Sequence, residues 1–326
     1  MGPIRNPRWG KGGLRVTLSY LVTDKPHVIN HLTVANNGSK FRLVLDARQI
    51  HPHLFKFKHK YEDANTAMQL FDKGNYIFSY DLKSAYHHLS IFHTDVTYLG
   101  IKWKGEYYVY NVLPFGLATS GYIFSKVVRE IVKYWRAKGL TIIMYLDDGL
   151  GGGDNYKNAL VASNVIKKDL DYFGFSVAHE KCNWAPVHIL EWSGFRWDVS
   201  EWVLKVTCKR IGKLKASLAG LVQLHSQDTV MFCVRFIAGI VGQIISTQAV
   251  LGVQTRLRMR HMYNCILARA SWISKIVFSI DAVKECIFWL INVERLNEIG
   301  FCQLTYNEAQ DAYIFVTHQI KVLVVI

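Results

Sequence analysis

Two adjacent aspartates close an apolar segment, and this feature constrains the fold more than any other. The segment Leu140–Met144 is apolar and partly β-branched, Tyr145-Leu146-Asp147-Asp148 follows it, and Gly149-Leu150-Gly151-Gly152-Gly153 comes next. An apolar run that ends in glycines predicts a buried strand that turns sharply. The two carboxylates are therefore expected at the rigid tip of a hairpin.

Paired carboxylates at a rigid tip are ligands that hard divalent cations prefer. Mg²⁺ takes oxygen ligands in octahedral geometry, and nucleotidyl transfer commonly uses two such ions about 3.5–4 Å apart. One hairpin cannot build that site alone. A third aspartate, Asp81, ends the strand-like run 75–80. The pattern therefore predicts that Asp81 joins Asp147 and Asp148.

The net charge of +14 is unevenly distributed along the 326 residues. Residues 1–80 carry +7, residues 81–204 are neutral, residues 205–275 carry +10 and residues 276–326 carry −3. Basic flanks around a neutral centre favour a polyanionic partner, because they can follow a phosphate backbone while the centre keeps its carboxylates for metal. For the first 80 residues a solvated basic surface is an equally good explanation.

Cysteine spacing and hydropathy exclude several classes of protein. The six cysteines form no closely spaced pair, which argues against a zinc module or a disulfide framework and favours an intracellular location, in the cytoplasm or nucleus. The first nine residues are charged but no apolar stretch follows them, so no signal peptide is expected. The most apolar segment, 236–245, is interrupted before about 18 residues and predicts a buried helix, with no membrane partner.

The order of predicted elements indicates an α+β fold with an antiparallel sheet backed by helices. Lys104-Gly105 lies between two apolar runs and predicts a hairpin, and Asp81 and Asp147 are expected to end neighbouring strands. The other predicted elements are a strand-rich segment at 1–56 with a strand at 41–46, helices at 121–135 and 155–173, a strand at 192–197 and a helical region at 205–297.

Several motifs occur in the order found in retroelement reverse transcriptases. They are Arg42-Leu43-Val44-Leu45-Asp46, Lys60-Tyr61-Glu62-Asp63, Asp81-Leu82-Lys83-Ser84-Ala85-Tyr86-His87-His88, Tyr98-Leu99-Gly100, Leu113-Pro114-Phe115-Gly116, Tyr145-Leu146-Asp147-Asp148-Gly149 and Glu180-Lys181-Cys182. All of them except Leu113-Pro114-Phe115-Gly116 resemble, more closely, the reverse transcriptases of DIRS-like and Ngaro-like tyrosine-recombinase retrotransposons. The resemblance runs from about residue 30 to about residue 300.

The resemblance implies a right-hand polymerase. Fingers are expected at 1–56 and 89–119, a palm with the catalytic site at 57–88 and 120–204, a basic helical thumb at 205–275, and a remnant of the connection toward a missing RNase H domain at 276–326. The strand at 192–197 corresponds to the grip on the primer end. The closing segment 320–326 is interpreted as a strand cut off from its sheet.

The resemblance also assigns roles to individual residues. Asp81 and Asp147 become the principal ligands of two Mg²⁺ ions, with Mn²⁺ as a possible substitute, and Asp148 supports them. Phe115 and Gly116 are expected to line the pocket for template and nucleotide. Gly116 would allow a close approach of the backbone.

Three further roles have simpler alternatives. Arg42 falls where the family holds the triphosphate of the incoming dNTP, but it could be a strand-edge surface arginine. Tyr86 falls where a ring stacks under the sugar and clashes with a 2′-hydroxyl, and it could also be a core aromatic. Lys181 matches a lysine proposed to protonate pyrophosphate, and a plain surface lysine is as good an explanation.

Two departures from the family pattern bear on function. Gly121 stands where related sequences usually have proline, and Ser193 stands where they usually have leucine. The first hypothesis is an RNA-directed DNA polymerase that extends a primer on an RNA or DNA template. The second is a truncated remnant that binds nucleic acid without useful catalysis. A nucleotide cyclase or DNA-templated polymerase would fit the carboxylates but neither 113–120 nor the strand with Arg42.

Overall fold

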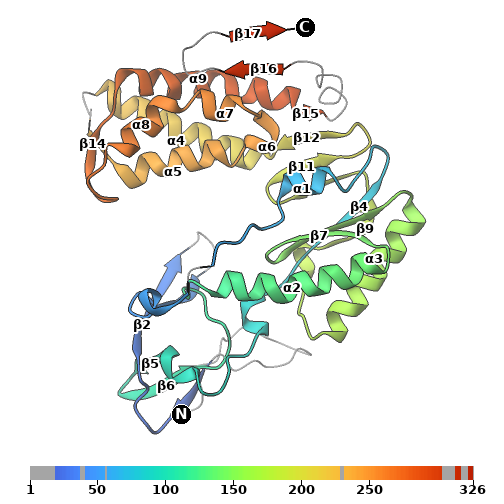
Figure 1. Ribbon diagram of the computed structural model, residues 1–326, viewed down its shortest axis with the longest axis vertical. Coiled ribbons are helices and arrows are strands. Elements are labelled where there is room, and N and C mark those ends of the chain that lie inside the picture. The colour runs from blue at the N-terminus through green and yellow to red at the C-terminus, as the bar shows by residue number, and fades with distance from the viewer. Residues whose placement is uncertain are drawn as a thin grey trace. The chain divides into compact units, whose positions relative to one another are not determined.

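The chain forms two compact units in the computed structural model, which describes residues 19–36, 41–55, 57–227, 231–302, 313–316 and 322–325 (Figure 1). Unit 1 takes its described residues from 1–70 and 78–186, and unit 2 takes them from 71–77 and 187–326. The mixture of antiparallel sheets and helices confirms the predicted α+β class. The predicted boundaries of fingers, palm and thumb stay a prediction.

Unit 1 contains a five-stranded sheet in the order β1-β6-β5-β2-β3 and a four-stranded sheet in the order β7-β8-β4-β9. Its strands are β1 (Ser19–Val22), β2 (Ile29–Asn36), β3 (Phe41–Asp46), β4 (Tyr76–Asp81), β5 (Gly100–Trp103), β6 (Glu106–Tyr110), β7 (Thr141–Tyr145), β8 (Asp148–Gly153) and β9 (Asn183–Val187). Its helices are α1 (Ala64–Met68), α2 (Ser120–Ala137) and α3 (Tyr156–Tyr172), with short 3₁₀ turns η1 (His51–His53), η2 (Ala85–His88), η3 (Val96–Leu99) and η4 (His179–Lys181).

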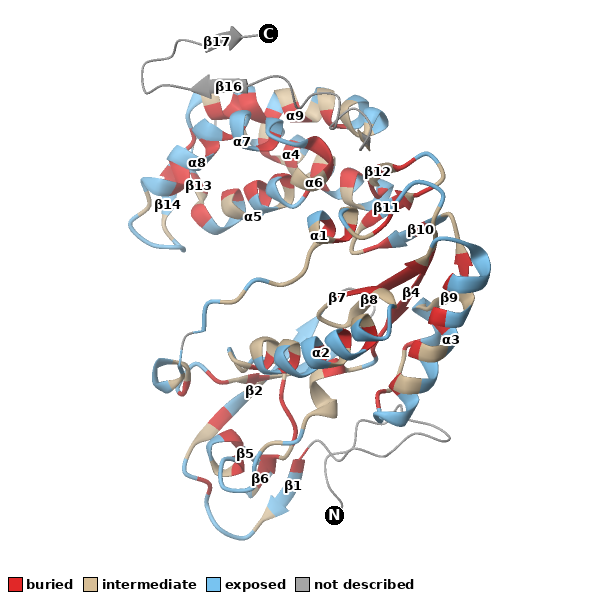
Figure 2. Ribbon diagram, turned by 45° about the vertical axis from the view of Figure 1, so that its right-hand side comes forward, coloured by how far each residue is buried: buried red, intermediate tan, exposed pale blue. Residues whose placement is uncertain are grey.

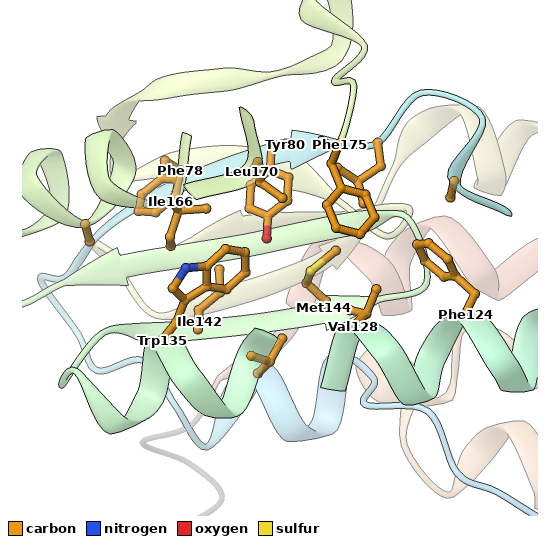
Figure 3. Packing of buried hydrophobic residues seen from close by; sticks show 14 residues of the cluster. Phe78, Tyr80, Phe124, Val128, Trp135, Ile142, Met144, Ile166, Leu170 and Phe175 are labelled. Atoms are coloured by element: carbon orange, nitrogen blue, oxygen red, sulfur yellow. The ribbon is translucent and has the colours of Figure 1, made fainter. Parts of the chain in front are cut away.

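Helices α2 and α3 cover the same face of the β7-β8-β4-β9 sheet (Figure 3). The amphipathic pattern of α2 buries Phe124, Val128, Val132 and Trp135 against this face, and α3 adds Ala162, Ile166 and Leu170. From the sheet come Phe78, Tyr80, Ile142 and Met144. Strand β4 is buried along almost its whole length (Figure 2), as expected for a central strand.

The glycines after Asp148 do not make the turn that the sequence predicted. They lie inside β8, where a Cβ atom on Gly149 would come within 2.2 Å of the Tyr80 ring and one on Gly151 within 2.4 Å of the Phe78 ring. Missing side chains on β8 therefore make room for rings on β4. Trp184 of β9 stacks on Tyr80 with a centroid distance of 5.2 Å and an interplanar angle of 5°.

Unit 2 holds small sheets and the other α-helices of the described residues. Its strands pair in the order β10-β11-β12-β15, and β13 pairs with β14 and β16 with β17. They are β10 (Ile189–Trp192), β11 (Phe195–Asp198), β12 (Val203–Val206), β13 (Met231–Cys233), β14 (Lys275–Val277), β15 (Phe301–Cys302), β16 (Tyr313–Val316) and β17 (Val322–Val325). The helices are α4 (Cys208–Ser226), α5 (Val234–Ile245), α6 (Gln248–Leu251), α7 (Gln254–Leu257), α8 (Arg260–Leu267) and α9 (Ile280–Ile299).

Unit 2 corrects three local predictions. The strand predicted at 192–197 is two strands joined at Ser193-Gly194, whose φ angles of 51° and 77° allow a tight turn. The helical region is interrupted by strands β13 and β14, which lie on the two sides of α5–α8 and pair with each other. The closing segment is not a strand without a partner, because Val322–Val325 pairs with Tyr313–Val316.

The apolar segment 236–245 lies in α5, which buries Val234, Ile237, Ile240, Val241 and Ile244, as predicted for a buried helix. Within the parts of the chain that the structure describes, no helix is both long enough and apolar enough to cross a bilayer.

Candidate active site

The β7-β8 hairpin places the adjacent aspartates at its tip, as predicted. Tyr145 pairs with Asp148, so Leu146 and Asp147 form a two-residue turn in which Leu146 has a φ of 54°. The Leu82 amide donates to the Asp147 carbonyl oxygen over 2.8 Å. This bond ties the turn to the end of β4. Strand β4 adjoins β8, which begins at Asp148, so Asp147 lies in the turn and does not end a neighbouring strand.

Asp81 points away from the helix-covered face of the sheet. Its neighbours Tyr80 and Leu82 belong to the core cluster under α2 and α3, and successive strand residues point to opposite faces. Asp81 is only 8% exposed, and its side chain is hydrogen-bonded to Asp148. The structure thus brings together the three carboxylates that the sequence singled out.

The carboxylate cluster holds more negative charge than its surroundings neutralise. Burial raises the pKa of Asp148 to about 7, and the hydrogen bond that protonated Asp148 donates to Asp81 and the charges of Asp147 and Asp81 act in the same direction. Burial also raises the pKa of Asp147, and the charge of Asp81 adds to this effect. A cation placed among these groups would relieve both the desolvation and the repulsion.

Lys181 supplies one positive charge to this cluster. It lies on η4, and its Nζ is 2.6 Å from Asp81 Oδ2. Burial lowers the pKa of Lys181, but the bond to Asp81 and the charges of the carboxylates outweigh burial, so the pKa is raised. Lys181 is therefore an ion-pair partner of Asp81, with its side chain 49% exposed.

The cluster fits divalent metal by its chemistry, since it offers three carboxylates with surplus buried charge. Among the described residues, however, no group of three or more histidine, cysteine, aspartate or glutamate side chains is arranged as a ready metal site. The Lys181 ammonium already contacts Asp81 Oδ2, so an ion bound to this oxygen would have to share it with Lys181. Asp81, Asp147 and Asp148 are the residues that would hold one.

Phe115 connects the other predicted residues. Its ring centroid lies 5.5 Å from the Arg42 guanidinium carbon and 5.2 Å from the ring centroids of Tyr86 and His87. Gly116 follows Phe115 and has a φ of 100°. It lies against β3, where an added Cβ would come within 2.0 Å of the Leu45 carbonyl oxygen. The close backbone approach that Gly116 permits is thus to β3.

Gly121 lies beside the hydroxyl groups of two tyrosines. A Cβ atom at this position would come within 2.8 Å of the Tyr61 hydroxyl and 3.4 Å of the Tyr86 hydroxyl. Tyr86 packs on Phe124 of the core while its hydroxyl end approaches α2, so this ring is partly buried and partly in the site. Both interpretations of Tyr86 are therefore compatible with its position.

A row of aromatic rings, which was not predicted from the sequence, leads toward the hairpin. This aromatic row consists of Phe55, Phe57, Tyr122, His59, Tyr61 and Tyr145, with consecutive ring centroids between 4.1 and 6.3 Å apart. Phe57 and Tyr122 are parallel within 5°. The first five rings line a surface groove of about 290 Å³. The alternation of aromatic residues with Lys58 and Lys60 was a signal available in the sequence.

The sequence that builds this site matches a known protein family. The family model described as reverse transcriptase (RNA-dependent DNA polymerase) matches residues 12–197, more than half of the chain. It covers all three aspartates, Arg42, Tyr86, Phe115, Gly116 and Lys181.

Solved structures with a similar fold come from foamy viral protease-reverse transcriptase. The dRH form in complex with double-stranded DNA is 15% identical, with a TM-score of 0.67, covering 87% of this chain and 46% of that chain. A second complex with double-stranded DNA has 15% identity and a TM-score of 0.65, covering 87% and 54%. A complex with an RNA/DNA hybrid has 14% identity and a TM-score of 0.64, covering 86% and 35%.

This chain therefore spans about half of those proteins or less. Identities this low show a shared fold alone. The family match rests on the sequence itself, and it includes the hairpin and the strand that bear the carboxylates. The chain belongs to the reverse transcriptase (RNA-dependent DNA polymerase) family.

Proposed function

We propose that the chain is the polymerase core of a retroelement reverse transcriptase, most similar to the DIRS-like and Ngaro-like elements. It transfers a nucleotide from a dNTP to a primer 3′-hydroxyl on an RNA or DNA template. The observation that carries this proposal is the assembly of Asp81, at the end of β4, with Asp147 and Asp148 of the adjoining β7-β8 hairpin. A remnant without catalysis would not need this costly group of buried carboxylates.

When bound to the three carboxylates, two Mg²⁺ ions would neutralise charge on the phosphates and on the attacking and leaving oxygens. Arg42 holds the triphosphate. Its guanidinium lies over Phe115, which limits its motion, and its charge acts on Asp147. Lys181 carries a proton near the carboxylates and can give it to the departing pyrophosphate.

The sugar of the nucleotide is held by Tyr86 and Phe115. The two rings pack at 5.2 Å with a tilt of 47°, so neither can move freely. A 2′-hydroxyl would meet the Tyr86 ring. We therefore expect Tyr86→Ala to raise incorporation of ribonucleotides relative to deoxyribonucleotides. An unchanged ratio would remove Tyr86 from this role.

The aromatic row supports binding of the template-primer. Phe55 is 83% exposed and Phe57 is 51% exposed, so a large part of each ring is open to a ligand. Unpaired bases stack on such rings, and each stacked base contributes about 1–3 kcal/mol. Exposed Lys58 and Lys60 between the rings can contact phosphates.

The deciding experiment is extension of oligo(dT) on a poly(rA) template with Mg²⁺. The wild type should incorporate deoxynucleotides, whereas Asp147→Asn should lose most incorporation and keep template-primer binding, because it removes a charge and not a fold element. Asp154→Asn, on the exposed turn before α3, is a matched control with full activity expected. Equal, poor incorporation by wild type and Asp147→Asn, with binding intact in both, would favour the remnant hypothesis.

A further inference from the structure

His88 uses both nitrogens of its ring, each on a backbone group. Its Nδ1 lies 3.1 Å from the Ala85 carbonyl oxygen, and its Nε2 lies 2.9 Å from the Ser176 amide nitrogen. The amide can only donate, so Nε2 must accept and carries no proton. Nδ1 then carries the proton and donates to Ala85. The neighbours thus select one neutral tautomer of His88.

These two bonds join two segments that carry predicted site residues. Ala85 and His88 are the ends of η2, the single turn that contains Tyr86. Ser176 lies in the loop between α3 and η4, and η4 contains Lys181. His88 is therefore the side chain that links the Tyr86 turn to the loop that leads to Lys181.

The backbone around this link is already aligned with the aspartate strand. The Lys83 amide donates to the Ser176 carbonyl oxygen over 2.8 Å, and the Ala178 amide donates to the Asp81 carbonyl oxygen over 2.8 Å. In the segment that follows Asp81, these backbone hydrogen bonds end at Lys83. Beyond it, the chain enters η2 through Ser84, which has a left-handed φ of 54°. The His88 bond to Ser176 is what extends the alignment past this bend.

A single 3₁₀ turn has little stability of its own, because its hydrogen bonds are few and poorly aligned. Its geometry must come from side chains that pack around it. Tyr86 and His87 pack on Phe115, and the His88 ring packs on Phe175 with a centroid distance of 5.2 Å. Burial lowers the pKa of His88, which favours the neutral ring that both bonds require.

We propose that His88 is a positioning residue of the polymerase site, holding the Tyr86 turn at a fixed distance from the loop that leads to Lys181. The proposal rests on the polymerase function proposed above. His88 touches neither substrate nor metal in this role. It acts through the position of the Tyr86 ring, and so on the choice between deoxyribonucleotides and ribonucleotides.

Two substitutions separate the two bonds. In His88→Gln the side-chain oxygen reaches about as far as Nε2 and can still accept from Ser176, whereas in His88→Asn the shorter amide can reach only Ala85. We expect His88→Asn to lower the ratio of kcat/KM for dNTP over rNTP about five-fold, the equivalent of one net hydrogen bond. His88→Gln should keep most of this ratio. His53→Asn, at an exposed histidine, is the matched control.

Hydrogen exchange provides a readout that does not depend on activity. The Ser176 amide and the amides of 85–89 should exchange faster in His88→Asn than in the wild type, and at nearly the wild-type rate in His88→Gln. A purely structural histidine would lower thermal stability in both variants and leave the nucleotide ratio unchanged, which would overturn the proposal. Unchanged exchange at Ser176 in His88→Asn would also overturn it. A wild type that extends no primer would refute the polymerase function, while exchange would still test the link.

Discussion

Replacing Gly151 by alanine tests whether the glycines of β8 are required by the rings of β4. The added Cβ would lie 2.4 Å from Cζ of Phe78 and within 3.0 Å of two further ring atoms. Phe78 is fully buried and lies 6.3 Å from the Trp184 ring, so it has little room to move. Overpacking of this kind costs about 1–3 kcal/mol. This exceeds the roughly 0.5–1 kcal/mol that alanine gains over glycine through backbone entropy.

The assay is urea unfolding of the whole chain, followed by near-ultraviolet circular dichroism. We expect Gly151→Ala to lower the free energy of unfolding by about 1–2 kcal/mol, the overpacking cost less the entropic gain. Gly212→Ala in α4 is the control, because no atom lies within 4 Å of its added Cβ, and it should be neutral or stabilising. Relative to the wild type, the free energy of unfolding should therefore fall in Gly151→Ala and stay equal or rise in Gly212→Ala.

A second substitution shows whether the ring is the cause. Phe78→Leu removes the atoms that the new Cβ would meet, so Gly151→Ala should cost less in that background, with a favourable coupling of about 0.5–3 kcal/mol. If Gly151→Ala unfolds like the wild type, or if its cost is the same with leucine at position 78, the explanation of β8 by ring packing is wrong.

Two further predictions concern pH and template binding. Burial lowers the pKa of His87 to about 4; the unfolded chain therefore binds a proton that the folded chain does not, and stability should fall by roughly 1.5 kcal/mol between pH 6.5 and 5. Urea unfolding of wild type and His87→Phe at both pH values checks this. If both proteins lose the same free energy of unfolding between the two pH values, His87 is not the source. Phe57→Ala and Tyr122→Ala should weaken binding of template-primers with an unpaired 5′ extension about tenfold and leave blunt duplexes unaffected. Fluorescence anisotropy with both substrates measures this, and equal losses on blunt duplexes would contradict stacking of unpaired bases.

Local patterns predicted the elements that bear the site. The helix predicted at 121–135 is α2 at Ser120–Ala137, and that at 155–173 is α3 at Tyr156–Tyr172, because each shows helical periodicity and each is followed by a glycine with positive φ. The hairpin around Lys104-Gly105 was also correct. Its first strand begins at Gly100, since residues 96–99 form a 3₁₀ turn.

What the sequence could not predict depends on contacts between distant segments. Glycines after an apolar run look like a turn, and only the β4 rings reveal that they are a strand. The bond from Ser176 to His88 joins residues 88 positions apart. Lys181 and Asp81 are 100 positions apart, and the sequence did not predict that they form an ion pair.

The alternating glycines of β8 also fix which residue of that strand faces which residue of β4. A shift of the strand by one position would bring the Leu150 side chain against the rings, where there is no space for it. Such a slip would also displace Asp148 by about 3.3 Å, the rise of one strand residue. Packing of the β4 rings against the β8 glycines thus fixes the register of the two strands. The position of Asp148 relative to Asp81 is therefore set in the hydrophobic core.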